Sequence, residues 1–349
     1  MKQAQVTTVV GLDVGDRTSH VYTIDFETGE VLAEGPVNTT RLGIRRFLGH
    51  LGRSRVVLEV GTHSRWLSAM LEEMGHEVLV ADARRLKMIY ADTNKQDRLD
   101  ARRLALLGRA DPRMLYPVHH RGEQAHLDLA IVKARAGLVS QRTRVVNQMR
   151  GMVKACGDRL PRCDTRNFAQ RVEGDLPAGL QPALEPLRKV LLLSGESIAA
   201  YDRDLAALAK TRYPETAALT QVYGVGVVTA LAFVLTLEDP GRFHKSREVG
   251  PALGMVPKRD QSGDRDLQLR ITKTGDSYLR SLLVEAAHCI MQERAPDSDL
   301  KRWGIARSAR GGPIARKRAV VAVARRLAVL LHRLWVTGAR YEPLRKPAA

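Results

Sequence analysis

The chain of 349 residues is long enough for two or three domains that each bury a core of their own. Its formal net charge of +18 and sequence pI of about 10.2 indicate a polyanionic partner, nucleic acid before a membrane surface. The excess of positive charge is concentrated in residues 301–349, where thirteen Lys and Arg residues accompany one acidic residue, Glu342.

The three cysteines, Cys156, Cys163 and Cys289, have no CxxC spacing and no paired histidines. This argues against a zinc site and fits a reducing cytosol. No signal-peptide pattern opens the chain and no run of about 18 apolar residues occurs, so we expect a cytoplasmic protein without a membrane span.

Residues 6–120 alternate between strand and helix patterns. Two apolar runs, residues 9–14 and 20–25, flank a short Gly/Asp/Arg turn and predict a hairpin. Further strands are expected at 31–32, 55–60 and 77–81, with helices at 42–51 and 66–74 between them. This order predicts a mixed sheet with helices on its faces, an α/β domain over residues 1–120.

Four acidic residues stand out in this segment. Asp13 ends the first strand, Glu59 lies within the strand at 55–60, and Asp97 and Asp100 share one face if their segment is helical. A buried carboxylate is costly unless a positive group pairs with it, so the four could converge on oxygen-liganded divalent metals. Asp13 taken alone is equally well explained as a turn residue.

Residues 121–213 have a different pattern. Apolar residues recur at heptad-like spacing in two long segments, Leu127, Ile131, Ala134, Leu138, Val145, Met149 and Met152, then Leu184, Leu187, Leu191, Ile198, Tyr201, Leu205 and Leu208. Two such helices predict an antiparallel coiled-coil hairpin or a dimerisation arm, with an ordinary helical bundle as the alternative.

Residues 214–349 predict a mainly helical domain. Gly224 and Gly226 resemble a helix-hairpin-helix turn that brings backbone N–H groups to a DNA phosphate, although an ordinary tight turn fits equally well. A dinucleotide fingerprint is disfavoured because the third glycine is missing. Residues 250–273 read as an exposed loop, followed by a helix capped by Asp276. A basic helix from Pro313 to about Trp335 carries Arg316, Lys317 and Arg318 and is expected to contact nucleic acid.

Together these motifs resemble a known family, the insertion-sequence transposases with a RuvC-like Asp-Glu-Asp-Asp domain and a C-terminal transposase domain, some guided by a bridge RNA. The similarity covers nearly the whole chain. Its N-terminal motifs are residues 11–15, 58–62 and 95–101, and its C-terminal motifs are residues 222–226, 253–257, 261–263 and 271–280.

The resemblance implies an RNase H-like first domain and a recombinase that cuts and rejoins double-stranded DNA, with a guide RNA and a homo-oligomer, dimer or tetramer, as partners. It also implies a nucleoid-associated protein of a bacterium or archaeon. Asp13, Glu59, Asp97 and Asp100 would hold Mg²⁺, and Ser262 would form a covalent phosphoserine link to DNA. Members of the family often have Ser-Ser-Gly where this chain has Gln261-Ser262-Gly263, so one serine is available here.

A serine hydroxyl needs a base or a metal to become a good nucleophile, and the segment around Ser262 offers no histidine. It does offer basic residues that can bind phosphate, namely Lys258, Arg259, Arg265, Arg270 and Lys273.

Three other functions remain open. The first is a RuvC-like metal-dependent nuclease or junction resolvase without a covalent intermediate. The second is an actin- or Hsp70-like ATPase, because residues 11–15 also fit the opening of that fold, although no second phosphate loop of that kind is visible and the charge argues against it. The third is a non-enzymatic nucleic-acid-binding protein.

Overall fold

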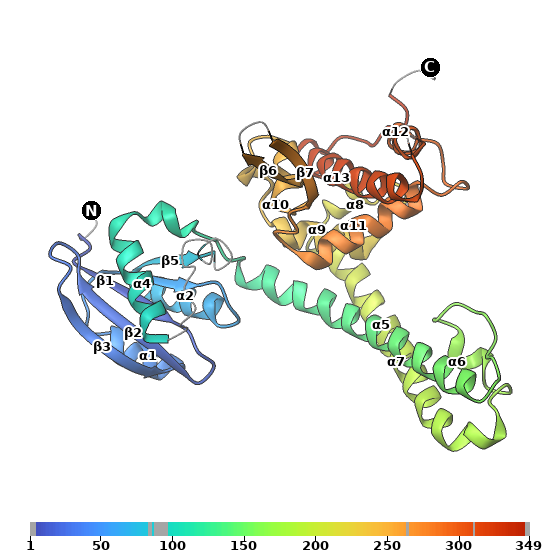
Figure 1. The fold of residues 1–349 in the computed structure, drawn as a ribbon, viewed down its shortest axis with the longest axis horizontal. Coiled ribbons are helices and arrows are strands. Elements are labelled where there is room, and N and C mark those ends of the chain that lie inside the picture. The colour runs from blue at the N-terminus through green and yellow to red at the C-terminus, as the bar shows by residue number, and fades with distance from the viewer. Residues whose placement is uncertain (1–4, 83–85, 87–96, 263–264, 310, 346–349) are drawn as a thin grey trace. The chain divides into compact units, whose positions relative to one another are not determined.

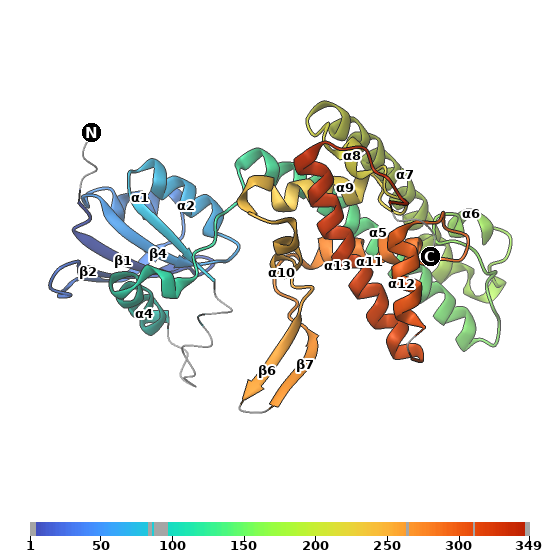
Figure 2. The same ribbon diagram turned by 90° about the horizontal axis from the view of Figure 1, so that it is seen from above.

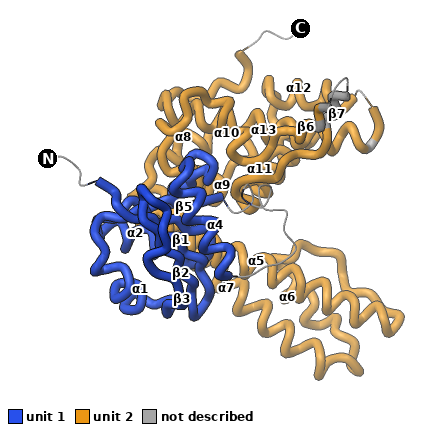
Figure 3. Tube along the Cα trace, turned by 60° about the vertical axis from the view of Figure 1, so that its left-hand side comes forward, with its two compact units in different colours: residues 1–121 blue, residues 122–349 orange. Residues whose placement is uncertain are grey.

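The computed structural model describes residues 5–82, 86, 97–262, 265–309 and 311–345. Contacts along the backbone divide the chain into two compact units, residues 1–121 and 122–349 (Figure 3). The helical segment predicted for residues 121–213 therefore groups with residues 214–349. The division of the chain into three domains stays a prediction.

Unit 1 is built on a five-stranded mixed sheet in the order β3-β2-β1-β4-β5 (Figure 1). The first three strands pair antiparallel, whereas β4 is parallel to β1 and β5 is parallel to β4. The strands are β1 (Thr8–Asp13), β2 (Thr18–Asp25), β3 (Val31–Asn38), β4 (Ser54–Glu59) and β5 (Glu77–Ala81). The predicted opening hairpin and mixed sheet are confirmed, and the third strand is longer than residues 31–32.

Helices cover both faces of this sheet, because alternate strand residues point to opposite sides. Val10 of β1 packs in a cluster with α1 (Arg41–Leu48) and α2 (Ser64–Glu73) on one face. Val9, its neighbour, packs with α4 (Asp97–Ala110) on the other. The neighbouring strands β1 and β4 have continuous apolar runs, residues 9–12 and 56–58, because both of their faces are buried there.

Unit 2 is mainly helical, and α9 (Val227–Leu237) lies in its core, with every residue from Thr229 to Leu237 buried. Around it pack α5 (Glu123–Ala155), α7 (Gln181–Thr211), α11 (Ser277–Ile290) and α13 (Pro313–Thr337). Shorter helices complete the unit, namely α6 (Phe168–Arg171), α8 (Thr216–Leu219), α10 (Val249–Ala252) and α12 (Asp299–Ser308). No helix among the described residues has the length and apolar character needed to cross a membrane.

Helices α5 and α7 form an antiparallel hairpin (Figure 1). At one end Val132 and Leu205 join the main core of unit 2, and at the other Val146 and Leu184 join a separate cluster around Phe168. The predicted contact positions on α7 are largely right, because Leu184, Leu191, Ile198 and Leu205 are buried. On α5 the prediction is wrong for Leu127, which is 53% exposed, since the buried row runs through Ala125, Leu129 and Val132 instead.

A buried carboxylate joins the two helices where the hairpin meets the core. Asp128 of α5 is 3% exposed and accepts hydrogen bonds from Arg212 Nη1, at 2.7 Å to each carboxylate oxygen, and from the Tyr213 hydroxyl at 2.7 Å. Burial raises the pKa of Asp128, but the hydrogen bonds from Arg212, Tyr213 and Gln124 outweigh it, so the pKa lies below its usual range.

The segment predicted as an exposed loop, residues 250–273, contains a two-stranded antiparallel ribbon instead. It is formed by β6 (Pro257–Ser262) and β7 (Arg265–Ile271), and Figure 2 shows it projecting from the helices of unit 2. A ribbon that projects in this way buries little side-chain area, so its strands need no apolar face.

Candidate active site and nucleic-acid-binding residues

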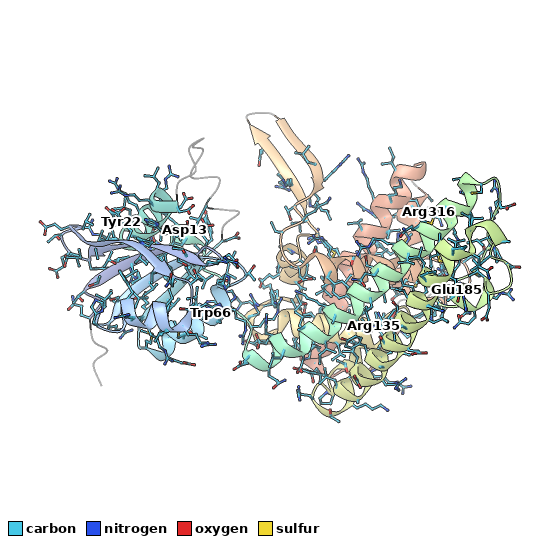
Figure 4. The ribbon with its side chains drawn as sticks, turned by 90° about the horizontal axis from the view of Figure 1, so that it is seen from below. Asp13, Tyr22, Trp66, Arg135, Glu185 and Arg316 are labelled. Atoms are coloured by element: carbon cyan, nitrogen blue, oxygen red, sulfur yellow. The ribbon has the colours of Figure 1, made fainter. Side chains whose placement is uncertain are left out.

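Asp13 and Glu59 lie side by side at the carboxyl end of the sheet. Leu12 of β1 pairs with Leu58 of β4 in parallel register, so the residue that follows each of them comes out at the same edge. Figure 4 labels Asp13 at this end of the sheet. The two carboxylates line a cavity of about 290 Å³ together with Val14, Asp16, Val60, Gly61, Thr62 and His63.

Helix α4 brings the Asp-x-x-Asp pair towards the same end. It crosses β1 at Gly11, where a Cβ atom would collide with the backbone of Ala101 and Ala105. Further along the helix, a Cβ atom on Gly108 would meet Val57 and Val9. The helix therefore runs from the Asp13 end of β1 towards its beginning, and its first turn, with Asp97 and Asp100, lies on the side of Asp13.

Ion pairs and hydrogen bonds hold α4 at both ends. Arg98 forms an ion pair with Glu34 of β3, and Arg109 donates to the carbonyls of Phe26 and Glu27 at 2.9 and 2.7 Å. These contacts, with the close approach at Gly11, leave the helix little freedom to shift. The position of Asp97 and Asp100 is therefore set by the scaffold.

The four carboxylates suit a hard cation, because oxygen ligands are those that Mg²⁺ prefers. They do not form a ready-made cluster: among the residues the structure describes, no three His, Cys, Asp or Glu side chains lie close enough to hold a metal ion. Asp100 instead forms an ion pair within its own helix, with its Oδ1 3.3 Å from Arg103 Nη1. The scaffold thus brings the acidic residues to one end of the sheet without fixing them as a metal-binding group.

His63, which sequence reasoning missed, lies in the same cavity. Its Nδ1 accepts a hydrogen bond of 3.0 Å from Trp66 Nε1, so the ring proton of the neutral form resides on Nε2. That nitrogen lies 3.5 Å from a carboxylate oxygen of Asp16. The sequence could have indicated His63 as a site residue, because it follows the Glu59 strand at the edge of the sheet where Asp13 was expected.

In unit 2, Ser262 is the last residue of β6 and pairs with Arg265 across the ribbon. Gly263 lies outside the described residues, as do Asn94, Lys95 and Gln96 of the predicted acidic motif. Lys258, Arg259, Arg270 and Lys273 are exposed. The structure thus gives the ribbon an exposed basic surface, with the Ser262 backbone at the end away from its base.

The base of the ribbon is tightly fixed. Gly254 and Gly275 have φ angles of +65° and +77°, and a Cβ atom on either would collide with the backbone of the opposite segment. Arg280 of α11 donates to the carbonyls of Leu253 and Thr274 at 3.0 and 2.9 Å. Two of the sequence motifs, residues 253–257 and 271–280, therefore meet at this point.

The glycines of the predicted helix-hairpin-helix turn have different roles. Gly224 has a φ of +85°, and a Cβ atom there would press on the Ala286 carbonyl and Cys289 of α11, so packing requires the glycine. Gly226 is the exposed N-cap of α9, with open space where a Cβ would be. The helix before the turn, α8, has only four residues, so the first helix of the predicted helix-hairpin-helix turn is short.

The basic helix is confirmed as α13, which begins at Pro313 as predicted. Arg316, labelled in Figure 4, is exposed, as are Lys317 and Arg318. Asp276 caps α11 by accepting from the Leu279 N–H at 2.8 Å, also as predicted. These basic residues therefore lie on the surface of unit 2, and their contact with nucleic acid stays a prediction.

Comparison with known proteins agrees with this picture. A family model described as "Transposase" matches residues 10–157, and a model of the transposase IS116/IS110/IS902 family matches residues 216–301. The chain is 31% identical to the transposase for insertion sequence element IS1111A of Coxiella burnetii, over 73% of this chain and 70% of the relative.

Two further relatives are more distant. The transposase for IS1328 of Yersinia enterocolitica is 26% identical over 82% of this chain and 84% of its own length. A probable family 20 transposase of Pseudomonas aeruginosa is 27% identical over 84% of this chain and 87% of its own length. The chain therefore belongs to the IS116/IS110/IS902 family of insertion-sequence transposases.

Proposed function

We propose that this transposase cuts and rejoins DNA by phosphoryl transfer, with Asp13, Glu59, Asp97 and Asp100 binding Mg²⁺ and Ser262 attacking the phosphate. The observation that carries the proposal is that two strand carboxylates and the first turn of α4 lie at the same end of the sheet. Parallel strand ends are where α/β folds commonly place their sites.

The residues divide the chemistry between them. Mg²⁺ bound to the carboxylates would supply Lewis-acid polarisation of the phosphate. The Ser262 hydroxyl loses its proton to solvent as its oxygen forms the new bond to phosphorus. The bond from phosphorus to the 3′ or 5′ oxygen of the DNA breaks, and that oxygen takes up a proton and leaves as a hydroxyl group. Cations of the ribbon, Lys258, Arg259, Arg265, Arg270 and Lys273, neutralise charge on the phosphate.

We propose further that target choice comes from pairing with a structured RNA, and that the active form is a homo-oligomer, a dimer or a tetramer. Base pairing would free the protein from reading sequence, which fits a surface rich in backbone-contacting cations. The helical hairpin of α5 and α7 has exposed apolar side chains, among them Leu127, Val190 and Leu193, that a partner copy would cover.

The acidic site is tested by strand cleavage in Mg²⁺ on a supercoiled plasmid that carries the element ends and their flanking non-coding DNA. Asp13→Asn, Glu59→Gln, Asp97→Asn and Asp100→Asn are each expected to abolish cleavage while DNA binding persists. Glu72→Gln, an equal charge change at an exposed position of α2, is the matched control. Full cleavage by all four variants would refute the metal site.

Ser262 is tested by trapping a covalent adduct that resists SDS and mapping the linked peptide. Ser262→Ala should bind DNA, RNA and metal yet form no adduct, whereas Ser277→Ala, an exposed serine at the start of α11, should behave like the wild type. A linkage at Ser277 or at a tyrosine would make the assignment wrong. Cleavage with free nicked ends and no adduct would instead favour the alternative function, a RuvC-like nuclease or junction resolvase.

A further inference from the structure

An arginine-lined groove lies in unit 2 where η4 (Ser246–Glu248), α12 and α13 meet. It encloses a cavity of about 340 Å³ lined by Arg247, Trp303, Arg307, Ala322, Arg325, Arg326 and Val329. A second cavity of about 420 Å³ shares Arg307 and continues along α13, past Gly311, Gly312, Ile314, Ala315 and Arg318. We call these two cavities together the Trp303 groove.

The charge of the groove is uncompensated. Across the part of the chain that the structure describes, no carboxylate forms an ion pair with Arg247, Arg307, Arg318, Arg325 or Arg326. Arg302, on the same helix as Arg307, differs in this respect, because it pairs with Asp297 at 2.6 Å. Like charges gathered without acidic partners repel one another, and an anion in the groove would relieve that repulsion.

Trp303 holds two of these arginines. The Arg326 Cζ lies 3.7 Å from the centroid of the indole, and the Arg307 Cζ lies 5.6 Å from it. A guanidinium stacked on a ring keeps its N–H edges available for hydrogen bonds to phosphate. Burial, followed by the charge of Arg307, lowers the pKa of Arg326, which agrees with two cations being held close together.

The hollow shape arises from the sequence of α13. Small residues alternate with arginines along one stripe of the helix, through Ala315, Arg318, Ala322, Arg325 and Val329. The opposite stripe, with Val323, Leu327 and Leu331, is buried in the core. Because the floor side chains are short, the groove stays open between the arginines.

The length of the groove fits a polymer better than a single ion. Arg318 and Arg325 are separated by about 10 Å of helix rise, which equals the axial length of about three nucleotides of one DNA strand, at about 3.4 Å of duplex axis each. The cavities on either side of Arg307 extend in the same direction along α13.

We propose that the Trp303 groove binds the phosphodiester backbone of DNA. The proposal rests on the proposed function only in taking DNA as the substrate. It adds a contact site separate from the carboxylates and the Ser262 ribbon, and this site includes Arg318 from the start of α13. Its cations are positioned by the fold before DNA arrives, so they contribute to binding any DNA sequence.

The test measures binding without chemistry, on the full chain in EDTA, so its result is independent of whether the carboxylates and Ser262 catalyse cleavage. A fluorescein-labelled random-sequence duplex is titrated at a series of salt concentrations. Arg307→Gln combined with Arg325→Gln should lower the slope of log affinity against log salt by about 1.8, because each phosphate contact contributes about 0.9. Arg302→Gln, which removes the same charge from an ion-paired arginine on α12, should leave the slope unchanged.

A second variant separates binding from fold stability. Ala322→Glu places a carboxylate between Arg325 and Arg326, so it should preserve or raise the melting temperature while lowering DNA affinity and the salt slope. An unchanged slope for Ala322→Glu, or an equal loss for Arg302→Gln, would overturn the proposal.

The source of the phosphate is tested separately. A slope change seen with single-stranded RNA but not with duplex DNA would overturn the assignment to DNA. Displacement of the duplex by inorganic phosphate at an equal concentration of phosphate groups would also overturn the assignment to DNA, because it would show that the groove binds a small ion.

Discussion

Replacement of Asp128 by alanine should destabilise unit 2 strongly, because the carboxylate is buried and accepts from Arg212, Tyr213 and Gln124. Breaking a buried ion pair costs about 3–5 kcal/mol. Arg212 is 47% exposed and can return to water, so the loss should fall below that range. What remains is mainly the partly buried Tyr213 hydroxyl and the hydrogen bonds to a charged group, so we expect about 2–3 kcal/mol.

The expected assay is thermal unfolding followed by circular dichroism and calorimetry. For a unit of this size, 2–3 kcal/mol corresponds to a decrease in melting temperature of about 5–10 °C. Asp128→Asn keeps the shape of the side chain and one acceptor oxygen, so its loss of unfolding free energy should be about half that of Asp128→Ala. Asp202→Ala is the matched control on the same two helices, because Asp202 pairs with Arg135 at 2.6 Å but is 47% exposed; such surface pairs contribute about 0.2–1 kcal/mol.

The same contribution should depend on pH. The pKa of Asp128 lies below the ordinary aspartate value of 3.8, so the folded state binds the proton less readily than the unfolded state. The stabilisation is therefore complete above that value and is lost as the pH falls through the lower, folded-state pKa. The difference in the free energy of unfolding between the wild type and Asp128→Asn should therefore decrease in strong acid. A loss in Asp128→Ala no larger than that in Asp202→Ala, or a difference that does not change with pH, would refute the reasoning.

Three further predictions follow from close contacts and exposed charges. Gly11→Ala should cost about 1–3 kcal/mol by pushing α4 away from β1, and should reduce strand cleavage, whereas Gly52→Ala, with open space around it, should change neither; equal melting temperatures would contradict the backbone contact. Arg280→Ala should free the base of the ribbon, seen as faster amide exchange at Leu253 and Thr274, with exchange in α9 as the internal reference. Neutralising the start of α13 (Arg316, Lys317 and Arg318 to Gln) should lower the salt slope of DNA binding by up to about 2.7, and a change in sequence preference at constant slope would count against backbone contacts.

Much of unit 1 could be predicted from sequence because its strands β1 and β4 are buried on both faces. Runs such as residues 9–12 and 56–58 are apolar without interruption, and Asp13 and Glu59 stand out where these runs end. The placement of α4 was harder to predict. It depends on Gly11 and Gly108, whose role is to leave room for another element and thus carries no periodic signal.

Unit 2 was less predictable for two physical reasons. The β6–β7 ribbon projects from the helices, so its pattern of Pro, Gly and charge reads as a loop, and only Leu267, Leu269 and Ile271 alternate as in a strand. In α5 the first turns face both α7 and α9, which shifts the buried row away from Leu127. The Trp303 groove brings together η4, α12 and α13, a meeting that no single stretch of sequence indicates.

The helical hairpin has apolar clusters at its two ends and a middle stretch with few buried residues. On α5 no residue between Val132 and Val146 is buried, and on α7 only Ile198 is buried between Leu191 and Leu205, both stretches being fully described. Removing or adding one heptad in both helices would move the distal tip by about 10 Å and rotate it by only about 20°. The hairpin can therefore serve as an adjustable spacer, whose reach can change among related elements while both end clusters keep their packing.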